Sequence, residues 1–243
     1  MNIDVKLVPT SVEAWGYKDK TVVVIDVLRA SSTIITALEN GARAVVPVLS
    51  ADEAVTLKTR YDSEYVLLGG ERGGLKIPGF DLGNSPLEYT EDIVEDKTIV
   101  FTTTNGTKAI RSAHSADILL IGSYLNLEAT AKKVVELGKD TLIICAGRQG
   151  SFSLEDAACA GTFCMTISRL TKTKETDSAK AARMIAASYH SPMKVFEDSE
   201  HGQILKDLGF EADLDFVASL NTCQAVPVYV NGQLVLGNEK KPR

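Results

Sequence analysis

The residues best suited to chemistry in this 243-residue chain are acids and bases set among glycines and small polar residues. Residues 26–33 (DVLRASST) begin with Asp26 and continue with an arginine and three hydroxyl side chains, and residues 68–74 (LGGERGG) set Glu71 and an arginine among four glycines. Carboxylates bind cations or accept protons, and arginine binds oxyanions through paired hydrogen bonds. These two loops therefore predict a site for a small anionic substrate. The glycines would let the backbone come close to that substrate, because they have no side chain.

Three further apolar segments run into loops of the same kind. They are residues 102–107 (TTTNGT), 121–126 (IGSYLN) and 145–151 (CAGRQGS). Open α/β sheets bind ligands at the carboxyl ends of their strands, where helix N-termini offer N–H groups to phosphate or sulfonate. Capping of the following helix would explain any single loop, because serine, threonine and asparagine are good N-caps. The recurrence of such loops favours an anion site over capping alone.

Several known phosphatase and hydrolase motifs are absent from the sequence. The glycine loops do not fit GxxxxGK[ST], no cysteine has an arginine six positions later, and Asp26 does not begin an Asp-x-Asp pair. Neither GxSxG nor HExxH occurs. Metal-assisted attack by water is therefore the simplest hydrolytic mechanism left.

The elements that must position these loops alternate between short apolar runs and helical patterns. We expect strands at residues 22–26, 44–48, 65–68, 98–101, 118–121 and 142–145. We expect helices at residues 32–40, 52–61, 107–113 and 127–137, and later at 154–170, 178–187 and 193–208. Such alternation predicts a three-layer α/β/α fold with a largely parallel or mixed sheet, followed by C-terminal helices.

The C-terminal segment predicts a β-hairpin. Asn231-Gly232 separates the apolar runs 225–230 and 233–236, and this dipeptide is the strongest short hairpin signal, so we expect an antiparallel edge here. No low-complexity linker divides the chain. We therefore expect one compact α/β domain over residues 1–243, with two lobes of about 1–150 and 151–243 as the alternative arrangement.

Composition narrows the function classes. The net charge of −6 argues against a nucleic-acid partner, which would need a basic surface. The chain has no apolar run long enough for a membrane span and no apparent secretory signal at its start. Its four cysteines lack zinc-site spacing and fit free thiols in a reducing compartment. We expect a cytoplasmic protein with neither nucleic-acid nor membrane partners.

Taken together, the loops resemble the 2-phosphosulfolactate phosphatase family. The segments that carry the resemblance occur in family order, and the match spans roughly residues 3 to 236. They are residues 26–33, 68–74, 80–86 (FDLGNSP), 103–107 and 152–156 (FSLED). The resemblance implies a Mg²⁺-dependent phosphoric monoester hydrolase that converts 2-phospho-3-sulfolactate into 3-sulfolactate and phosphate. It also implies a homodimer and, in methanogens, a step of coenzyme M biosynthesis.

The implied substrate carries a phosphate, a carboxylate and a sulfonate, about four negative charges near neutrality. Candidate substrate-binding residues are the basic, hydroxyl and amide side chains of the loops and one glycine: Arg29, Ser31, Ser32, Arg72, Lys76, Thr104, Asn105, Gly106, Thr107, Ser123, Asn126 and Arg148. Asp26 and Glu71 are the catalytic candidates, with Asp26 as metal ligand, general base or mere helix cap.

The candidate Mg²⁺ ligands are Asp26, Glu71, Asp81 and Asp156, with Glu155 in reserve. Structural roles compete with these assignments. Asp81 could only brace its turn, and Asp156 completes a capping box with Ser153. The three histidines are isolated in the sequence. His201 is the first choice among them for a functional role, although a histidine without such a role, exposed on the surface, is the more common case.

Two other functions fit the same residues. The chain could hydrolyse another small phosphorylated hydroxy acid, or it could bind anions without catalysis. Acids within the glycine-rich and strand-end loops favour catalysis, because a pure anion binder gains nothing from carboxylates there without a cation.

Overall fold

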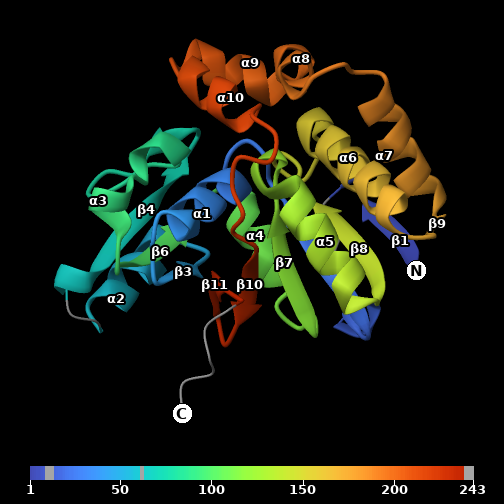
Figure 1. The fold of residues 1–243 in the computed structure, drawn as a ribbon. Helices are drawn as coiled ribbons and strands as arrows, with labels where there is room; N and C mark the ends of the chain where they lie inside the picture. The colour runs from blue at the N-terminus through green and yellow to red at the C-terminus, as the bar shows by residue number, and fades with distance from the viewer. Residues whose placement is uncertain (9–13, 61–62, 238–243) are drawn as a thin grey trace.

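A mixed sheet forms the centre of the molecule in the computed structural model, which describes residues 1–8, 14–60 and 63–237 (Figure 1). Its strands are β1 (Asn2–Lys6), β2 (Lys20–Ile25), β3 (Ala44–Pro47), β4 (Val66–Arg72), β5 (Leu75–Lys76), β6 (Thr98–Thr102), β7 (Ile118–Gly122), β8 (Asp140–Cys145), β9 (Lys174–Glu175), β10 (Pro227–Val230) and β11 (Gln233–Leu236). The order across the sheet is β5-β4-β6-β3-β11-β10-β7-β2-β8-β1-β9.

Strand β2 shows why these runs form buried parallel strands. It pairs in parallel with β7 on one side and β8 on the other, so that Val23 lies beside Leu120 and Ile143. Its side chains are fully buried from Thr21 onward, and alternate residues enter separate apolar clusters on the two faces. A strand covered on both faces needs apolar residues at every position, which explains its continuous run.

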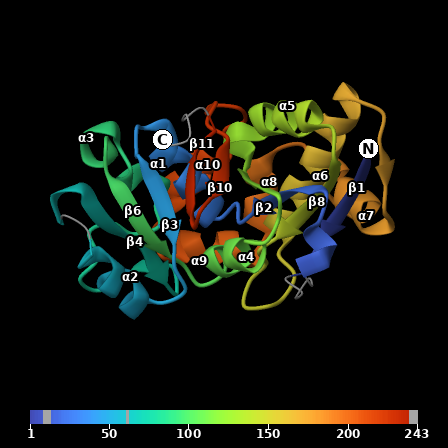
Figure 2. The same ribbon diagram turned by 90° about the horizontal axis from the view of Figure 1, so that it is seen from below.

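Helices complete the layers. They are α1 (Ala30–Glu39), α2 (Ala51–Lys58), α3 (Glu91–Val94), α4 (Gly106–Ser112), α5 (Leu127–Leu137), α6 (Leu154–Leu170), α7 (Asp177–Ala187), α8 (Pro192–Asp198), α9 (Glu200–Asp207) and α10 (Glu211–Val217), with short 3₁₀ turns η1 (Ala14–Tyr17), η2 (Ser63–Tyr65), η3 (Pro86–Glu88) and η4 (Tyr124–Asn126). Figure 2 shows α2 and α4 on one face of the sheet and α3 and α5 on the other. The predicted three-layer α/β/α fold is thus confirmed.

The predicted hairpin forms, but its predicted place at the edge of the sheet is wrong. β10 pairs with β11 through Val228 and Val235, as expected. β10 also pairs with β7, and β11 pairs with β3, so the hairpin lies between two sets of parallel strands. The local turn signal specifies the hairpin, whereas its outer neighbours come from distant parts of the chain.

The predicted helix at 193–208 is two helices. Ser199 has an extended backbone that ends α8, and its hydroxyl accepts the Gly202 N–H at 3.0 Å to cap α9. The predicted bounds of α5 and α6 agree with the structure, and α2 ends at Lys58, before the expected end at Tyr61, which lies outside the described residues. Strands β1, β5 and β9 and the helices α3 and α10 were not predicted.

Helices α8, α9 and α10 form a cap across one end of the sheet, at the top of the molecule in Figure 1. Two residues of α9, His201 and Ile204, line the same pocket as Asp26, which follows directly after β2. The cap therefore covers the carboxyl ends of the parallel strands, which is where open α/β sheets bind their ligands. Among the described residues, no helix has the length and apolar character to cross a membrane.

Candidate active site

A pocket that is partly open to solvent lies between the strand ends and the cap. Loops that follow β2, β4, β6 and β8 contribute to its wall, together with α9. The lining residues are Asp26, Leu28, Arg29, Glu71, Gly73, Gly74, Asn84, Thr104, Asn105, Arg148, Gln149, His201 and Ile204. Six of the residues predicted from the sequence thus meet in one pocket: Asp26, Arg29, Glu71, Thr104, Asn105 and Arg148.

Asp26 is a buried acid at the end of β2. Its backbone N–H donates to the Ser31 hydroxyl at 2.8 Å, which fixes the turn into α1. Burial raises the pKa of Asp26 to about 7, against the opposing charge of His201 and together with the like charges of Glu71 and Glu155. Asp26 therefore exchanges a proton near neutrality, as a general base should.

Gly106 is the first residue of α4, and its lack of a side chain lets the helix begin close to Asp26. A Cβ atom at this position would lie 2.6 Å from the Asp26 Oδ2 atom and 2.5 Å from the Ala30 Cβ atom. Any side chain here would displace the carboxylate or the start of α1. Gly106 thus shapes the site although it does not line the pocket.

Glu71 joins two of the predicted loops. Its Oε1 atom accepts the Thr104 N–H at 2.7 Å and its Oε2 atom accepts the Gly74 N–H at 2.8 Å. The first bond ties the end of β4 to the loop after β6, and the second closes the glycine-rich turn. Each oxygen keeps a further lone pair for a cation or a substrate hydrogen.

Glu155, a reserve candidate for the metal, and His201, the histidine singled out for a function, form a pair that was not predicted from the sequence. The His201 Nδ1 atom lies 3.3 Å from the Glu155 Oε1 atom, and the Glu155 side chain is almost fully buried. Burial would raise the pKa of Glu155, but the hydrogen bond and charge of His201 hold it below its ordinary value. His201 comes from α9 of the cap, and no residue near it in the sequence indicated Glu155 as its partner.

Two buried polar atoms of the pocket lining have no hydrogen bond within the part of the chain that the structure describes. The Asn84 Oδ1 and Thr104 Oγ1 atoms are buried, and neither has a hydrogen-bond partner among the described residues. Thr104 was predicted, whereas Asn84 was missed, its only signal being its place in residues 80–86. Buried polar atoms without partners are uncommon, so both are suited to contact a ligand.

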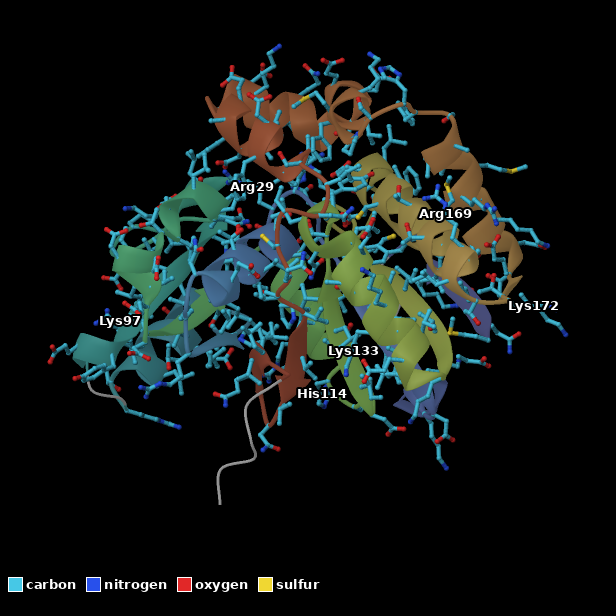
Figure 3. The ribbon with its side chains drawn as sticks, viewed as in Figure 1. Arg29, Lys97, His114, Lys133, Arg169 and Lys172 are labelled. Carbon is cyan, nitrogen blue, oxygen red and sulfur yellow. The ribbon has the colours of Figure 1, made fainter. Side chains whose placement is uncertain are left out.

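The two arginines of the pocket differ in their freedom. Arg148 lies in the loop after β8 and forms an ion pair with Glu200 at 2.9 Å, with its side chain 27% exposed. Arg29 is buried beneath the cap, near α9 and α10 in Figure 3, and its Nη1 atom lies 2.6 Å from the Asp213 Oδ2 atom. Arg148 can exchange its exposed partner for an anion more readily than Arg29 can.

The other predicted acids do not line the pocket. Asp156 is buried behind it, where its two oxygens accept the N–H groups of Val27 at 2.8 Å and Gly147 at 3.0 Å. Asp81 accepts the Leu68 N–H at 2.7 Å and pairs with Lys58 at 2.8 Å. Asp156 thus joins the turns after β2 and β8, and Asp81 ties its loop to β4 and α2. The predicted capping box of Ser153 and Asp156 does not form, because the Ser153 hydroxyl makes no capping hydrogen bond. The roles of Asp81 and Asp156 as metal ligands stay predictions.

The remaining predicted substrate-binding residues also lie outside the pocket lining. Hydrogen bonds within the fold engage Ser31, Ser32, Thr107, Ser123 and Asn126. Arg72 donates to the Glu71 carbonyl oxygen at 2.6 Å and to the Thr102 hydroxyl at 2.9 Å. Lys76 is exposed on β5. Substrate contacts by these residues stay predictions.

Comparison with known proteins supports an enzyme. The family model of 2-phosphosulpholactate phosphatase matches residues 7–232. A probable 2-phosphosulfolactate phosphatase of Clostridium acetobutylicum is 42% identical over 236 residues, which cover 97% of this chain and 100% of that protein. A protein of the same name from Caldanaerobacter subterraneus is 42% identical over 223 residues, 91% of this chain and 92% of that protein. The chain therefore belongs to the 2-phosphosulfolactate phosphatase family, whose members are phosphoric monoester hydrolases.

Proposed function

We propose that this chain hydrolyses 2-phospho-3-sulfolactate to 3-sulfolactate and phosphate, with Mg²⁺ as its cofactor. The observation that carries the proposal is the position of Asp26, a buried acid with a pKa of about 7, in a strand-end pocket beside Glu71, Glu155 and His201. Family membership supplies the substrate class, and the acids together with donors on the same wall supply the means to cleave a phosphate ester.

The residues of the pocket fit Mg²⁺. The negative charges of Glu71 and Glu155 both raise the pKa of Asp26, so the acids repel one another and a divalent cation would relieve that repulsion. Within residues 1–8, 14–60 and 63–237, no cluster of three or more His, Cys, Asp or Glu side chains is disposed to hold a metal ion. Mg²⁺ suits a smaller set, because it binds through one or two carboxylates and completes its octahedron with water and phosphate oxygens.

We assign the cation to Glu71, with the Asp26 carboxylate beside it free to act as the general base. Bound there, Mg²⁺ would neutralise charge on the phosphate and lower the pKa of a bound water. The Glu71 carboxylate is held in orientation by the N–H groups of Thr104 and Gly74. The Asp26 carboxylate accepts the proton of the attacking water, because a base with a pKa near neutrality is both unprotonated and sufficiently basic.

Donors elsewhere in the pocket bind the anionic groups of the substrate. The Thr104 hydroxyl lacks a partner among the described residues and can donate to a phosphate oxygen. Arg148 can release Glu200 at the exposed mouth and pair with an incoming anion. The cap contributes the apolar side chain of Ile204 to the pocket lining.

The deciding experiment measures phosphate release from 2-phospho-3-sulfolactate with Mg²⁺ and after addition of EDTA. We expect turnover with the metal and a loss of turnover with EDTA that added Mg²⁺ restores. Asp26→Asn should lower kcat by about 10²- to 10⁴-fold, the usual contribution of a general base, while the variant stays folded. Equal rates with and without EDTA would refute the role of Mg²⁺, and a folded Asp26→Asn variant with a normal rate would remove Asp26 from the mechanism.

A further inference from the structure

One amide side chain of the pocket lining has a buried oxygen that no described residue contacts through a hydrogen bond. The Asn84 side chain is 6% exposed, lines the pocket, and leaves Oδ1 without a hydrogen-bond partner among the described residues. Its backbone is fixed, because its carbonyl oxygen accepts the Thr33 hydroxyl at 2.9 Å. Burial of an amide without a partner is unfavourable, since the hydrogen bonds to water are lost. A ligand group in the pocket can supply the missing hydrogen bond, and a turn of the amide by 180° presents either its oxygen or its NH₂.

Arg29 is linked to Asn84 through the next residue of the chain. The Ser85 hydroxyl donates to Asp213 Oδ1 at 2.6 Å, and the other Asp213 oxygen accepts from Arg29 Nη1 at 2.6 Å. Arg29 Nη2 donates to the Gly74 carbonyl oxygen at 2.7 Å. These contacts take two of the five N–H donors of a guanidinium, and Arg29 also lines the pocket. The corner formed by Asn84 and Arg29 can therefore donate hydrogen bonds to a ligand.

This corner carries donors but almost no net charge. The Arg29 and Asp213 side chains are only 1% and 3% exposed, so the two opposite charges compensate each other within the protein. Such a site favours an anion with a single, widely spread charge, because a doubly charged phosphate would lose more hydration than the corner could replace. The reacting phosphate belongs instead beside Asp26 and Glu71, where a cation compensates its charge.

We propose that Asn84 and Arg29 bind the sulfonate group of the substrate, and that Asn84 determines specificity for a sulfonated phosphate ester. This inference rests on the proposed function. A sulfonate has three acceptor oxygens and one negative charge. It can accept hydrogen bonds from the Asn84 NH₂ group once the amide turns, and from the Arg29 N–H groups that Asp213 and Gly74 leave unused. Asp213 serves as a positioning residue, because it holds Arg29 against the wall and cancels the charge that would attract a second phosphate.

The test compares kcat/KM for 2-phospho-3-sulfolactate and 2-phospholactate, which lacks the sulfonate, in the full chain with Mg²⁺. The ratio of the two values should fall about 10- to 100-fold in Asn84→Ala, because a hydrogen bond to a charged group is lost. It should fall further in Asn84→Asp, which keeps the side-chain shape but repels an anion. Asp215→Asn, an exposed position on the same helix as Asp213, is the matched control and should keep the wild-type ratio. An unchanged ratio in both folded Asn84 variants would overturn the proposal.

A second measurement separates this inference from the proposed function. Millimolar 3-sulfolactate should raise the Tm of the wild-type protein more than lactate does, and this difference should disappear in Asn84→Ala and Asn84→Asp. If the wild-type chain releases no phosphate from 2-phospho-3-sulfolactate, the proposed function fails, and this difference still supports the sulfonate site. An equal Tm rise from 3-sulfolactate in the wild type and in a folded Asn84 variant would overturn the sulfonate site, whatever the turnover.

Discussion

The loops that follow two neighbouring strands have similar composition, but one lines the pocket and the other does not. β2 and β7 lie side by side in parallel register, with Ile25 beside Gly122, and both run into loops of small polar residues. The loop after β2 opens onto the pocket through Asp26. The loop after β7 closes on itself, because Ser123 and Asn126 form a capping box and Asn126 also donates to the Ala225 carbonyl oxygen at 2.8 Å. The difference is that the segment before β10 supplies an acceptor for the Asn126 amide through Ala225, whereas Asp26 at the end of β2 lines the pocket.

Two buried aspartates, Asp26 and Asp156, show the same contrast between a group that lines the pocket and one that is bonded within the fold. Asp156 has each of its oxygens bonded to a backbone N–H, so its carboxylate holds the turns after β2 and β8 together. Asp26 lines the pocket, where Glu71 and Glu155 oppose its charge. Burial of an acid is thus compatible with a structural or a chemical role, and the partners decide between them.

The largest expected effect is a rise in the free energy of unfolding when Asp26 is replaced by asparagine. Its folded pKa of about 7 lies above the ordinary 3.8, so the folded state binds more protons than the unfolded state between these values, and stability falls as pH rises through this window. Asn at position 26 cannot ionise. In EDTA at pH 8, Asp26→Asn should therefore be more stable than wild type by on the order of 2–4 kcal/mol, and near pH 4 the gain should vanish.

Urea unfolding of both proteins at pH 4, 6 and 8 measures this effect. Equal free energies of unfolding at pH 8 would show that Asp26 resembles Asp156 and that the contrast between the two acids is mistaken.

A smaller effect of opposite sign is expected at Asp156. Asp156→Ala leaves the buried N–H groups of Val27 and Gly147 without their acceptor, which should destabilise the protein by about 1–3 kcal/mol. Burial, together with the like charges of Asp26 and Glu155, raises the pKa of Asp156, so removal of this acid offsets part of the loss but does not replace the two bonds. Thermal unfolding at pH 7 checks the sign. If Asp156→Ala were more stable than the wild type, the two aspartates would not differ in their structural roles as inferred.

The smallest effect is expected at the strand end that closes on itself. Ser123→Ala removes the hydroxyl that accepts the Leu125 N–H at 3.3 Å and lies 2.8 Å from the Ser32 hydroxyl. Loss of an N-cap of this kind should lower stability by about 1 kcal/mol. Unfolding and KM should be measured together. A KM raised tenfold with unchanged stability would show that Ser123 binds substrate, as predicted from the sequence, and that the loop after β7 belongs to the site.

The elements of the fold were largely predictable from the sequence. The apolar run of β2, the periodicity of α5 and α6 and the Asn-Gly turn of the hairpin are local patterns, and each element forms at about the residues expected, although the hairpin does not lie at the sheet edge. The association of acids, glycines and strand ends also led to Asp26 and Glu71, which meet in the pocket. Such features are readable because hydrophobic periodicity and turn chemistry act over a few neighbouring residues.

Other features depend on contacts between distant segments. Asn84 and His201 reach the pocket from a loop and from the cap, and the hairpin enters the middle of the sheet between β3 and β7. Nothing near these residues in the chain specifies their partners. The sequence therefore predicted which loops could bind an anion, while the packing of the cap and hairpin selected the residues that face it, because a side chain's partners are set by the surfaces that close around it.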